Sequence, residues 1–491
     1  MNNLNFLVDV LKESPVFKTL EKNVKPGRTV CASGLSTINK SNIIYALCRL
    51  KGVTAFCLAS DEKEAQTLCN DLSCMGLRAY VYPVRDFNFL DFQSRSHEYE
   101  HARLKVLLKL LNHECDVAIA CVDAAAQLTV PRNVLEQSVI EFEEGRELSL
   151  EKATKALTLL GYERFDAVEG SGQFSLRGGI LDFFMPDSDY PVRCEFWGDE
   201  ITDLSYFDIE TQRRFKKADK ITLSPSTEIV IEDRAALADK IEHKAKLLRS
   251  KNSAKAKEKL FSEAELIRSG AMIANADKFI NQIYDKPESL FDYLDRNTLV
   301  FASEFTAIQE RGKSMDFISN ETLMQGFEDG TLCRGFDRFA LTFNECTEFL
   351  QSHGTIVLEN FVHGSMPIKL SEIISFSTKQ LSAWGGSYKQ LKEDVDGLFT
   401  PESKGVIFAG TERAAKNLCD TFNADGINAV YSEGADKISK GELLVMQGAL
   451  SAGFEYPSQK FFAITYSQVS YRPEKSKKKK KKTNWTRHWK A

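Results

Sequence analysis

Residues 28–59 read RTVCASGLSTINKSNIIYALCRLKGVTAFCLA. The apolar runs at 29–33 and 53–59 each have the length of a short buried strand, and apolar residues recur between them at helical spacing as far as Gly52. The order of strand, loop, helix and strand predicts the beginning of a parallel sheet whose strands are joined through helices.

The same alternation continues to about Thr129. Helical patterns at 61–76 and 97–113 follow apolar runs, and further strand patterns lie at 79–84 and 116–126. Strands that alternate with helices over this length predict a doubly wound parallel sheet.

Residues 34–41, GLSTINKS, nearly match the phosphate-binding loop G-x-x-x-x-G-K-[S/T]. Gly34, Lys40 and Ser41 stand at the expected offsets, but Asn39 replaces the second glycine. The loop follows a predicted strand and opens a predicted helix, which is the context that such a loop requires. A working nucleotide site, the relic of one and a chance match all remain open on this evidence.

A different pattern begins after Thr129. One amphipathic helix is predicted over 148–164, and the stretches 172–186 and 190–208 alternate with period two between Gly and Pro breaks, which is typical of antiparallel sheet. If the apolar set is buried, the opposite face presents four candidate binding residues: Arg177, Arg193, Glu195 and Trp197. A tryptophan beside arginines is typical of a binding hot spot. The alternative is that a helix covers this face and Trp197 belongs to the core.

The remaining chain predicts a long helical region over 234–284, a strand at 297–304 and a last α/β unit over 371–470. The expected fold class is therefore multidomain α/β, in which a parallel-sheet α/β domain is interrupted by an antiparallel α+β domain and followed by a second small α/β domain. The expected segments are the first α/β part, the antiparallel domain, the second α/β part, the small α/β domain and a basic tail, at 1–134, 135–222, 223–370, 371–470 and 471–491.

Composition narrows the class of protein. The 491 residues are too many for one ordinary core, and 43% of them are hydrophobic and 27% charged, as in globular proteins. Residues 472–491 carry ten cations against Glu474 alone, a charge of +9, so the formal −5 of the whole chain leaves −14 on residues 1–471. An acidic body argues against a broad nucleic-acid surface. The 11 scattered cysteines have neither zinc nor redox spacing, and no membrane span or secretion signal is evident, so a cytoplasmic protein with reduced thiols and no metal site is expected.

The stretch 170–214, GSGQFSLRGGILDFFMPDSDYPVRCEFWGDEITDLSYFDIETQRR, closely resembles a module shared by the excision-repair protein UvrB and the transcription-repair coupling factors (Mfd). Its hallmarks are R-G-G-x-L-D-x-F, P-x-R-x-E-F-x-G-D-E-I and F-D-x-x-T-Q-R. The preceding stretch 81–107 resembles the coupling factors rather than UvrB, whose tyrosine-rich, damage-probing hairpin is not evident here. The resemblance covers about residues 5–470.

This resemblance implies that the antiparallel domain binds UvrA, the damage-recognition ATPase. The UvrA-contacting positions of the family fall on Arg177, Arg193 and Trp197, which the alternation places on the open face with Glu195. The implied function is recruitment of UvrA in transcription-coupled nucleotide excision repair. The alternative is an ATP-dependent helicase-like repair subunit of the UvrB type that uses the loop at 34–41.

The resemblance also bears on the loop, which is intact and binds ATP in UvrB but is degenerate in the coupling factors. A magnesium-binding strand should end in Asp-Glu, whereas the corresponding strand at 297–304 ends in Ser303 and Glu304. A hydroxyl is a poor replacement for a carboxylate that holds hydrated magnesium. Asp123 is a rival for the metal role but fits an ordinary residue at a strand end. The loop is thus expected to be a relic, with no catalytic residue and no cofactor in this chain, although ATP and Mg²⁺ serve the full-length family.

Full-length members of the family continue into a polymerase-binding domain, a DNA translocase and a carboxy-terminal domain that masks the UvrA-binding face. None of these is recognisable here, so RNA polymerase and DNA are expected as partners only through such domains. The lysine run 477–482 resembles the family's basic linker, and the residues that follow do not resemble the expected continuation. A slip in reading frame at the lysine codons and a designed truncation both remain open.

Overall fold

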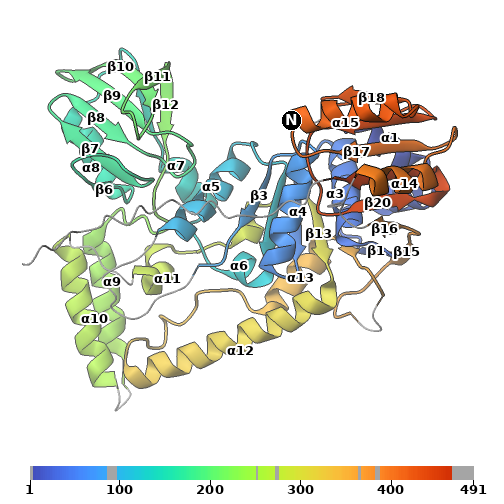
Figure 1. Cartoon of the computed structure of the whole chain (residues 1–491). Helices are drawn as coiled ribbons and strands as arrows, with labels where there is room; N and C mark the ends of the chain where they lie inside the picture. The colour runs from blue at the N-terminus through green and yellow to red at the C-terminus, as the bar shows by residue number, and fades with distance from the viewer. Residues whose placement is uncertain are drawn as a thin grey trace, which may run out of the picture.

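The computed structural model of the chain describes residues 4–85, 97–249, 253–270, 276–362, 366–381 and 388–466 (Figure 1). The basic tail at 471–491, with its lysine run, lies outside the described residues, as does part of the 81–107 stretch that carries the resemblance.

A parallel sheet occupies the middle of the molecule. Over the described residues it has seven strands in the order β15-β1-β14-β13-β2-β4-β3, and all neighbouring pairs run parallel. The strands are β1 (Val30–Ser33), β2 (Ala55–Ala59), β3 (Ala79–Tyr82), β4 (Val117–Cys121), β13 (Leu299–Ser303), β14 (Thr355–Leu358) and β15 (Glu372–Ser375). Strands β1, β2, β4 and β14 are buried along their whole length, as expected for a parallel sheet that is covered on both faces.

Helices cover both faces of this sheet. They are α1 (Asn5–Lys12), α2 (Pro15–Asn23), α3 (Thr37–Lys51), α4 (Glu62–Cys74), α5 (Glu98–Leu111), α6 (Val122–Ala126), α7 (Arg132–Gln137), α12 (Phe305–Asp329) and α13 (Phe343–His353). Several begin where the sequence supplies a capping side chain: the Asp61 carboxylate accepts a hydrogen bond from the Glu64 amide at 2.7 Å, and Thr342 and Glu345 form a capping box. The 25-residue helix α12 runs along the lower edge of Figure 1, from the parallel sheet towards α10.

The antiparallel module lies between β5 and β12, at the upper left of Figure 1. Its larger sheet has the order β11-β10-β9-β8-β7-β6, in which the β6–β7 pair alone runs parallel, and β5 pairs with β12 in a separate two-stranded sheet. The elements are β5 (Ile140–Glu143), α8 (Leu150–Leu159), β6 (Glu163–Arg164), β7 (Gln173–Arg177), β8 (Ile180–Phe183), β9 (Val192–Trp197), β10 (Glu200–Phe207), β11 (Arg214–Lys217) and β12 (Lys220–Leu223). A separate apolar cluster, which includes Phe142, Leu157, Phe183 and Phe196, forms its core.

A helical unit follows the antiparallel module. It contains α9 (Arg234–Leu247), α10 (Ser253–Arg268), the 3-10 helix η1 (Ala276–Phe279), α11 (Ile280–Ile283) and the 3-10 helix η2 (Leu290–Tyr293). Helices α9 and α10 pack as a hairpin around Ile241, Leu260 and Ile267, which agrees with the helical region expected over 234–284.

The second α/β unit lies at the right of Figure 1, on the opposite side of the parallel sheet from the antiparallel module. Its sheet has the order β16-β20-β21-β17-β19-β18, with β20 antiparallel to both of its neighbours. The elements are β16 (Lys379–Leu381), α14 (Tyr388–Leu398), β17 (Lys404–Phe408), α15 (Glu412–Ala424), β18 (Ala429–Ser432), β19 (Glu442–Met446), β20 (Gly453–Tyr456), the 3-10 helix η3 (Pro457–Gln459) and β21 (Phe461–Thr465).

The mixed α/β class expected from the sequence is confirmed. One strand crosses an expected boundary: β15 begins after residue 370, where the second α/β domain was expected to start, yet it pairs with β1 at the edge of the first sheet. The physical reason is that Ile374 of β15 is buried in the apolar cluster together with Val30 and Ala32 of β1.

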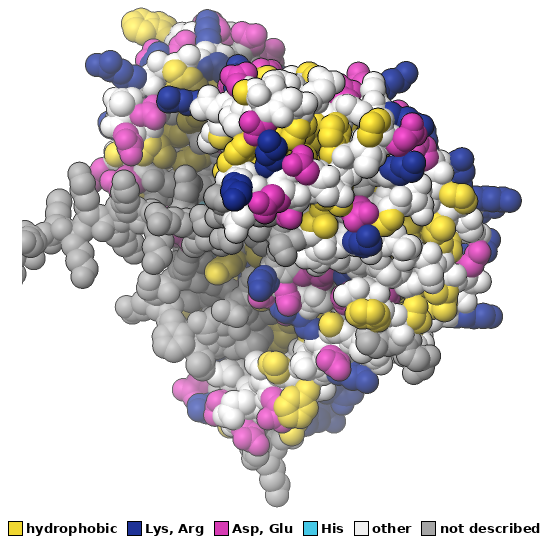
Figure 2. Space-filling view, turned by 45° about the vertical axis from the view of Figure 1, so that its right-hand side comes forward, with side chains coloured by type: hydrophobic (Ala, Val, Ile, Leu, Met, Phe, Trp, Pro, Cys, Tyr) yellow, Lys and Arg dark blue, Asp and Glu magenta, His cyan; other side chains and the backbone are white. Residues whose placement is uncertain are grey.

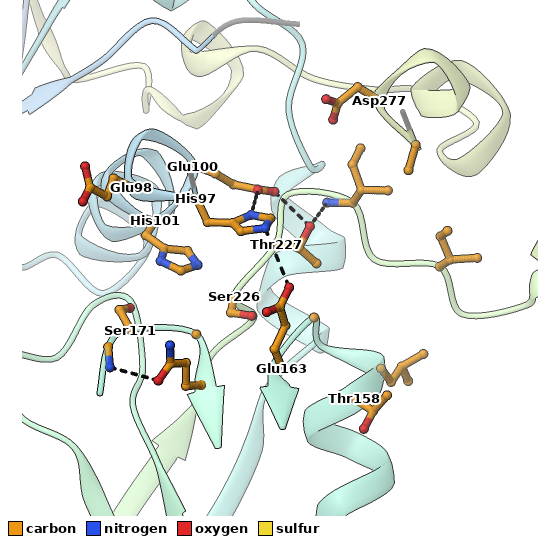
Figure 3. A pocket seen from close by; sticks show the side chains of 18 of the residues that line it. His97, Glu98, Glu100, His101, Thr158, Glu163, Ser171, Ser226, Thr227 and Asp277 are labelled. Atoms are coloured by element: carbon orange, nitrogen blue, oxygen red, sulfur yellow. Dashed lines mark hydrogen bonds and ion pairs between the residues drawn. The ribbon is translucent and has the colours of Figure 1, made fainter. Parts of the chain in front are cut away.

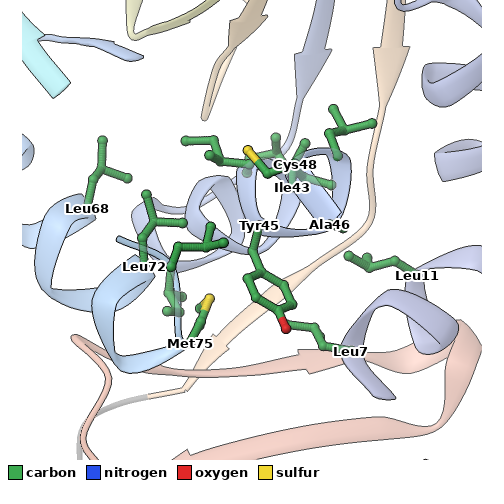
Figure 4. Close-up of a cluster of buried hydrophobic side chains, with 14 of the residues drawn as sticks. Leu7, Leu11, Ile43, Tyr45, Ala46, Cys48, Leu68, Leu72 and Met75 are labelled. Atoms are coloured by element: carbon green, nitrogen blue, oxygen red, sulfur yellow. The ribbon is translucent and has the colours of Figure 1, made fainter. Parts of the chain in front are cut away.

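The two α/β units share one apolar core. Helix α3 packs against α1 and α4 through the residues of Figure 4, which include Leu7, Ile43, Tyr45 and Leu72. The same cluster continues into the second unit through residues of β17, β19, β20 and β21, and the rings of Phe6 and Phe461 lie 6.1 Å apart. Helix α3 is therefore buried between two sheets.

Gly34 provides a test of how tightly the loop before α3 is packed. Its φ is +79°, and a Cβ at this position would lie 2.2 Å from the carbonyl oxygen of Phe376. Gly52, at the end of α3, has φ +63° with nothing within 4 Å of such a Cβ. We expect Gly52→Ala to lower the free energy of unfolding by about 1 kcal/mol and Gly34→Ala by at least roughly twice that, since backbone must also move. Chemical denaturation of both variants measures the difference, and equal losses would contradict the described packing.

Candidate functional site

The open face of the antiparallel sheet shows the alternation that the sequence predicted. Along β9, Val192, Cys194 and Phe196 are buried, while Arg193 and Glu195 are half-buried and Trp197 is 82% exposed. A tryptophan with four fifths of its surface in solvent is not a core residue, so the alternative placement of Trp197 is wrong. We call the set Arg177, Asp182, Arg193, Glu195 and Trp197 the Arg–Trp face.

Asp182 of β8 holds the two arginines of this face together. The Arg193 guanidinium donates to both carboxylate oxygens, at 2.7 Å from Nε and 2.8 Å from Nη2, and Nη2 of Arg177 donates to Oδ2 at 2.8 Å. The Asp182 side chain is buried, whereas that of Arg177 is 52% exposed and that of Arg193 only 13%. A bidentate pair with a buried carboxylate fixes the guanidinium plane of Arg193 before any partner arrives.

Further contacts extend the network. Arg193 also donates to the carbonyl oxygen and to the side-chain Oε1 of Gln212, at 3.3 and 3.0 Å, and its Cζ lies 4.4 Å above the Phe207 ring. Glu195 accepts a hydrogen bond from Arg214, which also donates to Asp203 at 2.7 Å. The charges of the Arg–Trp face are thus balanced and oriented within the sheet, while Trp197 and Arg177 project the most surface to solvent.

One residue of the neighbouring strand departs from the expected alternation. Ser175 of β7 is 1% exposed although it was expected on the open face, and Leu176 is only half-buried. The Ser175 hydroxyl donates to the carbonyl oxygen of Asp166 at 2.8 Å, because the segment before β7 folds over this part of the sheet.

The loop at 34–41 follows a strand and precedes a helix, as a phosphate loop does. Its hydrogen bonds, however, are made within the chain. The amides of Gly34 and Leu35 donate to the carbonyl oxygens of Asn360 and Glu359, each at 3.1 Å, and Leu35 is fully buried. These backbone donors bind the chain itself and not a ligand.

Lys40 is the residue that would contact phosphate in such a loop, and its ammonium group has three donors. It donates to Glu304 Oε1 at 2.6 Å, to Ser303 Oγ at 2.9 Å and to Glu64 Oε1 at 3.2 Å, while its side chain is only 2% exposed. Burial opposes ionisation of Glu64, but the neighbouring Lys40 charge and hydrogen bonds from Ser303 and Ser60 hold its pKa below the usual range. All three donors of the Lys40 ammonium group are used. Two carboxylates already lie against this group, and bound phosphates would add more negative charge beside them.

The magnesium half of the site fits no better. Ser303 donates its hydroxyl to Glu64 at 2.6 Å, and Glu304 is paired with Lys40. Ser41, which would bind the metal, donates to Thr37 O and Asp71 Oδ2, each at 3.4 Å. The residues present therefore do not fit ATP with Mg²⁺. Within the described residues, no group of three or more His, Cys, Asp and Glu side chains could hold a metal ion.

Three further acids lie near the loop. Asp123 pairs with Arg311 at 2.7 Å and accepts the Ala124 amide at 3.0 Å, which makes it a residue that joins α6 to α12. Glu359 accepts the Phe305 amide at 2.7 Å, and burial together with the Glu304 charge raises its pKa to about 7. Asp71 is also buried, which raises its pKa to about 6.

A cavity of about 460 Å³ lies where the antiparallel module meets α5 and the helical unit (Figure 3). His97 Nδ1 lies 2.9 Å from Glu100, and His97 Nε2 lies 4.0 Å from Glu163 of β6. Glu100 in turn accepts the Thr227 hydroxyl at 2.9 Å and the Glu228 amide at 2.8 Å. Beneath it, Arg103 and Glu228 form a fully buried pair at 2.6 Å. The cavity wall thus belongs to a charge network that anchors the antiparallel module through the segment that follows β12.

Sequence reasoning missed Asp182, Glu64, Glu359 and Tyr456 as partners of the predicted residues. The signal for Asp182 was present, because it alternates with Leu181 and Phe183 and so shares the face of Arg193 across the sheet. Tyr456 carried no such signal, since it meets Asn39 and Asn42 from more than 400 residues away.

On the face that Figure 2 shows, the charges of the described residues do not gather into a patch of one sign. In Figure 2, Lys and Arg side chains are interspersed with Asp and Glu over the visible face. Among the described helices, none combines the length and the apolar character that crossing a bilayer would demand.

The raised pKa of Glu359 gives a prediction about pH. A glutamate in an unfolded chain has a pKa near 4.3, so the folded state holds this proton more tightly. The stabilisation of the folded state by this proton is therefore complete below about pH 4.3 and is lost as pH rises through about 7. Glu359→Gln keeps an acceptor for the Phe305 amide and cannot ionise. We expect its free energy of unfolding to fall less than that of wild type between pH 5 and 8, and to exceed wild type at pH 8.

Denaturation at a series of pH values measures this, with Glu348→Gln on the exposed side of α13 as the matched control. Parallel pH profiles for wild type and Glu359→Gln would contradict the assignment.

Comparisons with known proteins cover the antiparallel module and most of the rest of the chain. Residues 140–229 match a family model described as the UvrB interaction domain. The chain is similar to the transcription-repair-coupling factor of Bacillus subtilis, with 26% identity over 489 residues that cover 96% of this chain and 41% of that protein. It is 25% identical to that of Staphylococcus epidermidis, covering 82% and 35%, and 22% identical to that of Staphylococcus aureus, covering 98% and 41%. The chain thus spans about two fifths of the length of these relatives. The predicted resemblance is confirmed: nearly all of this chain is similar to part of the transcription-repair-coupling factors, and its residues 140–229 match the UvrB interaction domain.

Proposed function

We propose that this chain recruits UvrA in transcription-coupled nucleotide excision repair, through the Arg–Trp face of its UvrB interaction domain. The observation that carries the proposal is Trp197, 82% exposed on the same face of the sheet as Arg177 and Arg193, which buried Asp182 orients. Exposed tryptophan and oriented arginine are the side chains most enriched at binding hot spots. RNA polymerase and DNA would be contacted by other parts of the full-length relatives.

The oriented arginines indicate how docking would work. Arg177 offers half of its side-chain surface to a partner, while Arg193 is held in place and presents only the edge of its guanidinium. A partner carboxylate that approaches the pair meets fixed donors, so little side-chain entropy is lost on binding. Trp197 would fill an apolar pocket beside it, which excludes water from the charged contacts.

The chemistry of the loop at 34–41 supports binding over catalysis. An ATP-dependent repair subunit would need Lys40 and Ser41 free for phosphate and magnesium, and both are engaged within the chain. The proposed place of action is the cytoplasm. All 11 cysteines lie in the described ranges as free thiols, ten of them buried, which suits a reducing compartment.

Substitutions on the two faces of β9 test the proposal. We expect Trp197→Ala and Arg177→Ala to weaken UvrA binding at least roughly tenfold, or ~1.4 kcal/mol, without loss of fold. Arg193→Ala should lower both affinity and stability, because it leaves the buried Asp182 carboxylate with Arg177 alone. Phe196→Ala, on the buried face, should cost about 3 kcal/mol of stability.

Isothermal titration against UvrA, with circular dichroism of each variant, measures both quantities. Wild-type chain that gives no heat of binding would refute the proposed function. Unfolding by Trp197→Ala with a silent Phe196→Ala would show that the faces are inverted.

The interpretation of Lys40 has its own test. Lys40→Ala removes the cation that pairs with the half-buried carboxylates of Glu64 and Glu304, so we expect a loss of about 3 kcal/mol in the free energy of unfolding. Wild-type chain should show no ATP hydrolysis above background and no rise in melting temperature with ATP and Mg²⁺. The helicase-like alternative predicts instead that ATP stabilises wild type and that Lys40→Ala abolishes this effect.

A further inference from the structure

Asn39, the residue that departs from the phosphate-loop pattern, lies on a buried face of α3 and has a hydrogen-bond partner in the second α/β unit. Asn39 and Asn42 are one turn apart on α3 and both are 0% exposed. A buried amide must form hydrogen bonds, because leaving it unpaired costs stability. The Tyr456 hydroxyl of β20 accepts from Asn42 Nδ2 at 3.0 Å and from Asn39 Nδ2 at 3.4 Å, and the Ser36 hydroxyl donates to Asn39 Oδ1 at 2.6 Å.

A second polar contact joins the same two units close by. Asp71 of α4 accepts hydrogen bonds from the amide and from the hydroxyl of Ser451, each at 2.7 Å. Asp71 also accepts the longer contact from Ser41, the last residue of the loop. Two positions of the loop at 34–41 are therefore connected to the second α/β unit. Asn39 contacts it directly, and Ser41 is connected to it through Asp71.

Apolar contacts surround these polar pairs. Leu450, Phe454 and Phe461 of the second unit belong to the same buried cluster as the α1 residues Leu7 and Leu11. Polar groups placed inside such a cluster add little net attraction, but they penalise every other orientation of the two units. The contact is a specific interface rather than a loose association of neighbouring domains.

We propose that the degenerate loop and α3 form a docking surface for the second α/β unit. In this surface, the Asn39 amide recognises the Tyr456 hydroxyl by a hydrogen bond. The asparagine then has a structural role that glycine could not fill. This role is independent of UvrA binding, which takes place on another module. It also predicts that restoring the glycine does not restore a nucleotide site, since Lys40 stays paired with Glu304 and Glu64.

Hydrogen exchange on the whole chain, read by mass spectrometry, tests the interface. Tyr456→Phe keeps the ring and removes the acceptor of both amides. We expect amide exchange in Thr37–Lys51 and in Gly453–Thr465 to become about tenfold faster together. Tyr431→Phe is the matched control, because the Tyr431 hydroxyl of β18 has no hydrogen-bond partner among the described residues. Ser451→Ala removes the hydroxyl donor of the second contact and leaves the amide donor, so it should accelerate the same two segments by less.

Unchanged exchange in both segments for Tyr456→Phe and Ser451→Ala would overturn the proposal. Asn39→Gly gives an independent arm: we expect faster exchange at Gly453–Thr465 and no saturable binding of ATP with Mg²⁺ in isothermal titration. Saturable ATP binding by Asn39→Gly with exchange at Gly453–Thr465 as in wild type would show that the loop is not a docking surface. For the double variant Asn42→Ala with Tyr456→Phe, we expect an increase in exchange smaller than the sum of the two single increases, because both substitutions remove the same hydrogen bond.

Discussion

Helix α3 is covered by a sheet on each side, and this constraint governs the rest of the loop region. A helix in that position has no water to satisfy its polar groups, so Asn39, Lys40, Ser41 and Asn42 each bond within the chain. The ammonium of Lys40 satisfies all three of its donors with oxygens from two other elements. The loop lies between a strand and a helix, as a phosphate loop does, while Asn39 and Ser41 contribute to the contact between the two α/β units.

The antiparallel module has the opposite property, because its Arg–Trp face leaves Trp197 and half of the Arg177 side chain in solvent. Asp182 is buried and bonds two arginines, so both guanidinium groups are ordered, while the side chain of Arg177 stays 52% exposed and that of Arg193 13%. Trp197 stands beyond the last of these contacts, at the end of β9, with most of its surface in solvent. The chain thus combines an interface that is closed within the molecule with one that is open to another protein.

Local periodicity explains how much of this was predictable. The period-two pattern of β9 set both of its faces, since alternation depends only on neighbouring residues. Helix α12 was missed because its apolar residues do not form one stripe, and Phe317 and Ile318 are more than 60% exposed. Strand β14 was missed because its three apolar residues after Thr355 give too short a signal. The Asn39–Tyr456 contact joins residues 417 positions apart, and nothing local to either residue encodes it.

The central claim is that this chain works as a UvrA-binding module and not through nucleotide at residues 34–41. An exchange footprint tests it most directly, by comparing amide exchange of the whole chain with and without UvrA, and then with ATP and Mg²⁺ alone. The account predicts that UvrA slows exchange within Gln173–Trp197 and leaves the loop unchanged, and that ATP with Mg²⁺ slows exchange nowhere. Protection of residues 34–41 by ATP, with no protection of Gln173–Trp197 by UvrA, would contradict it.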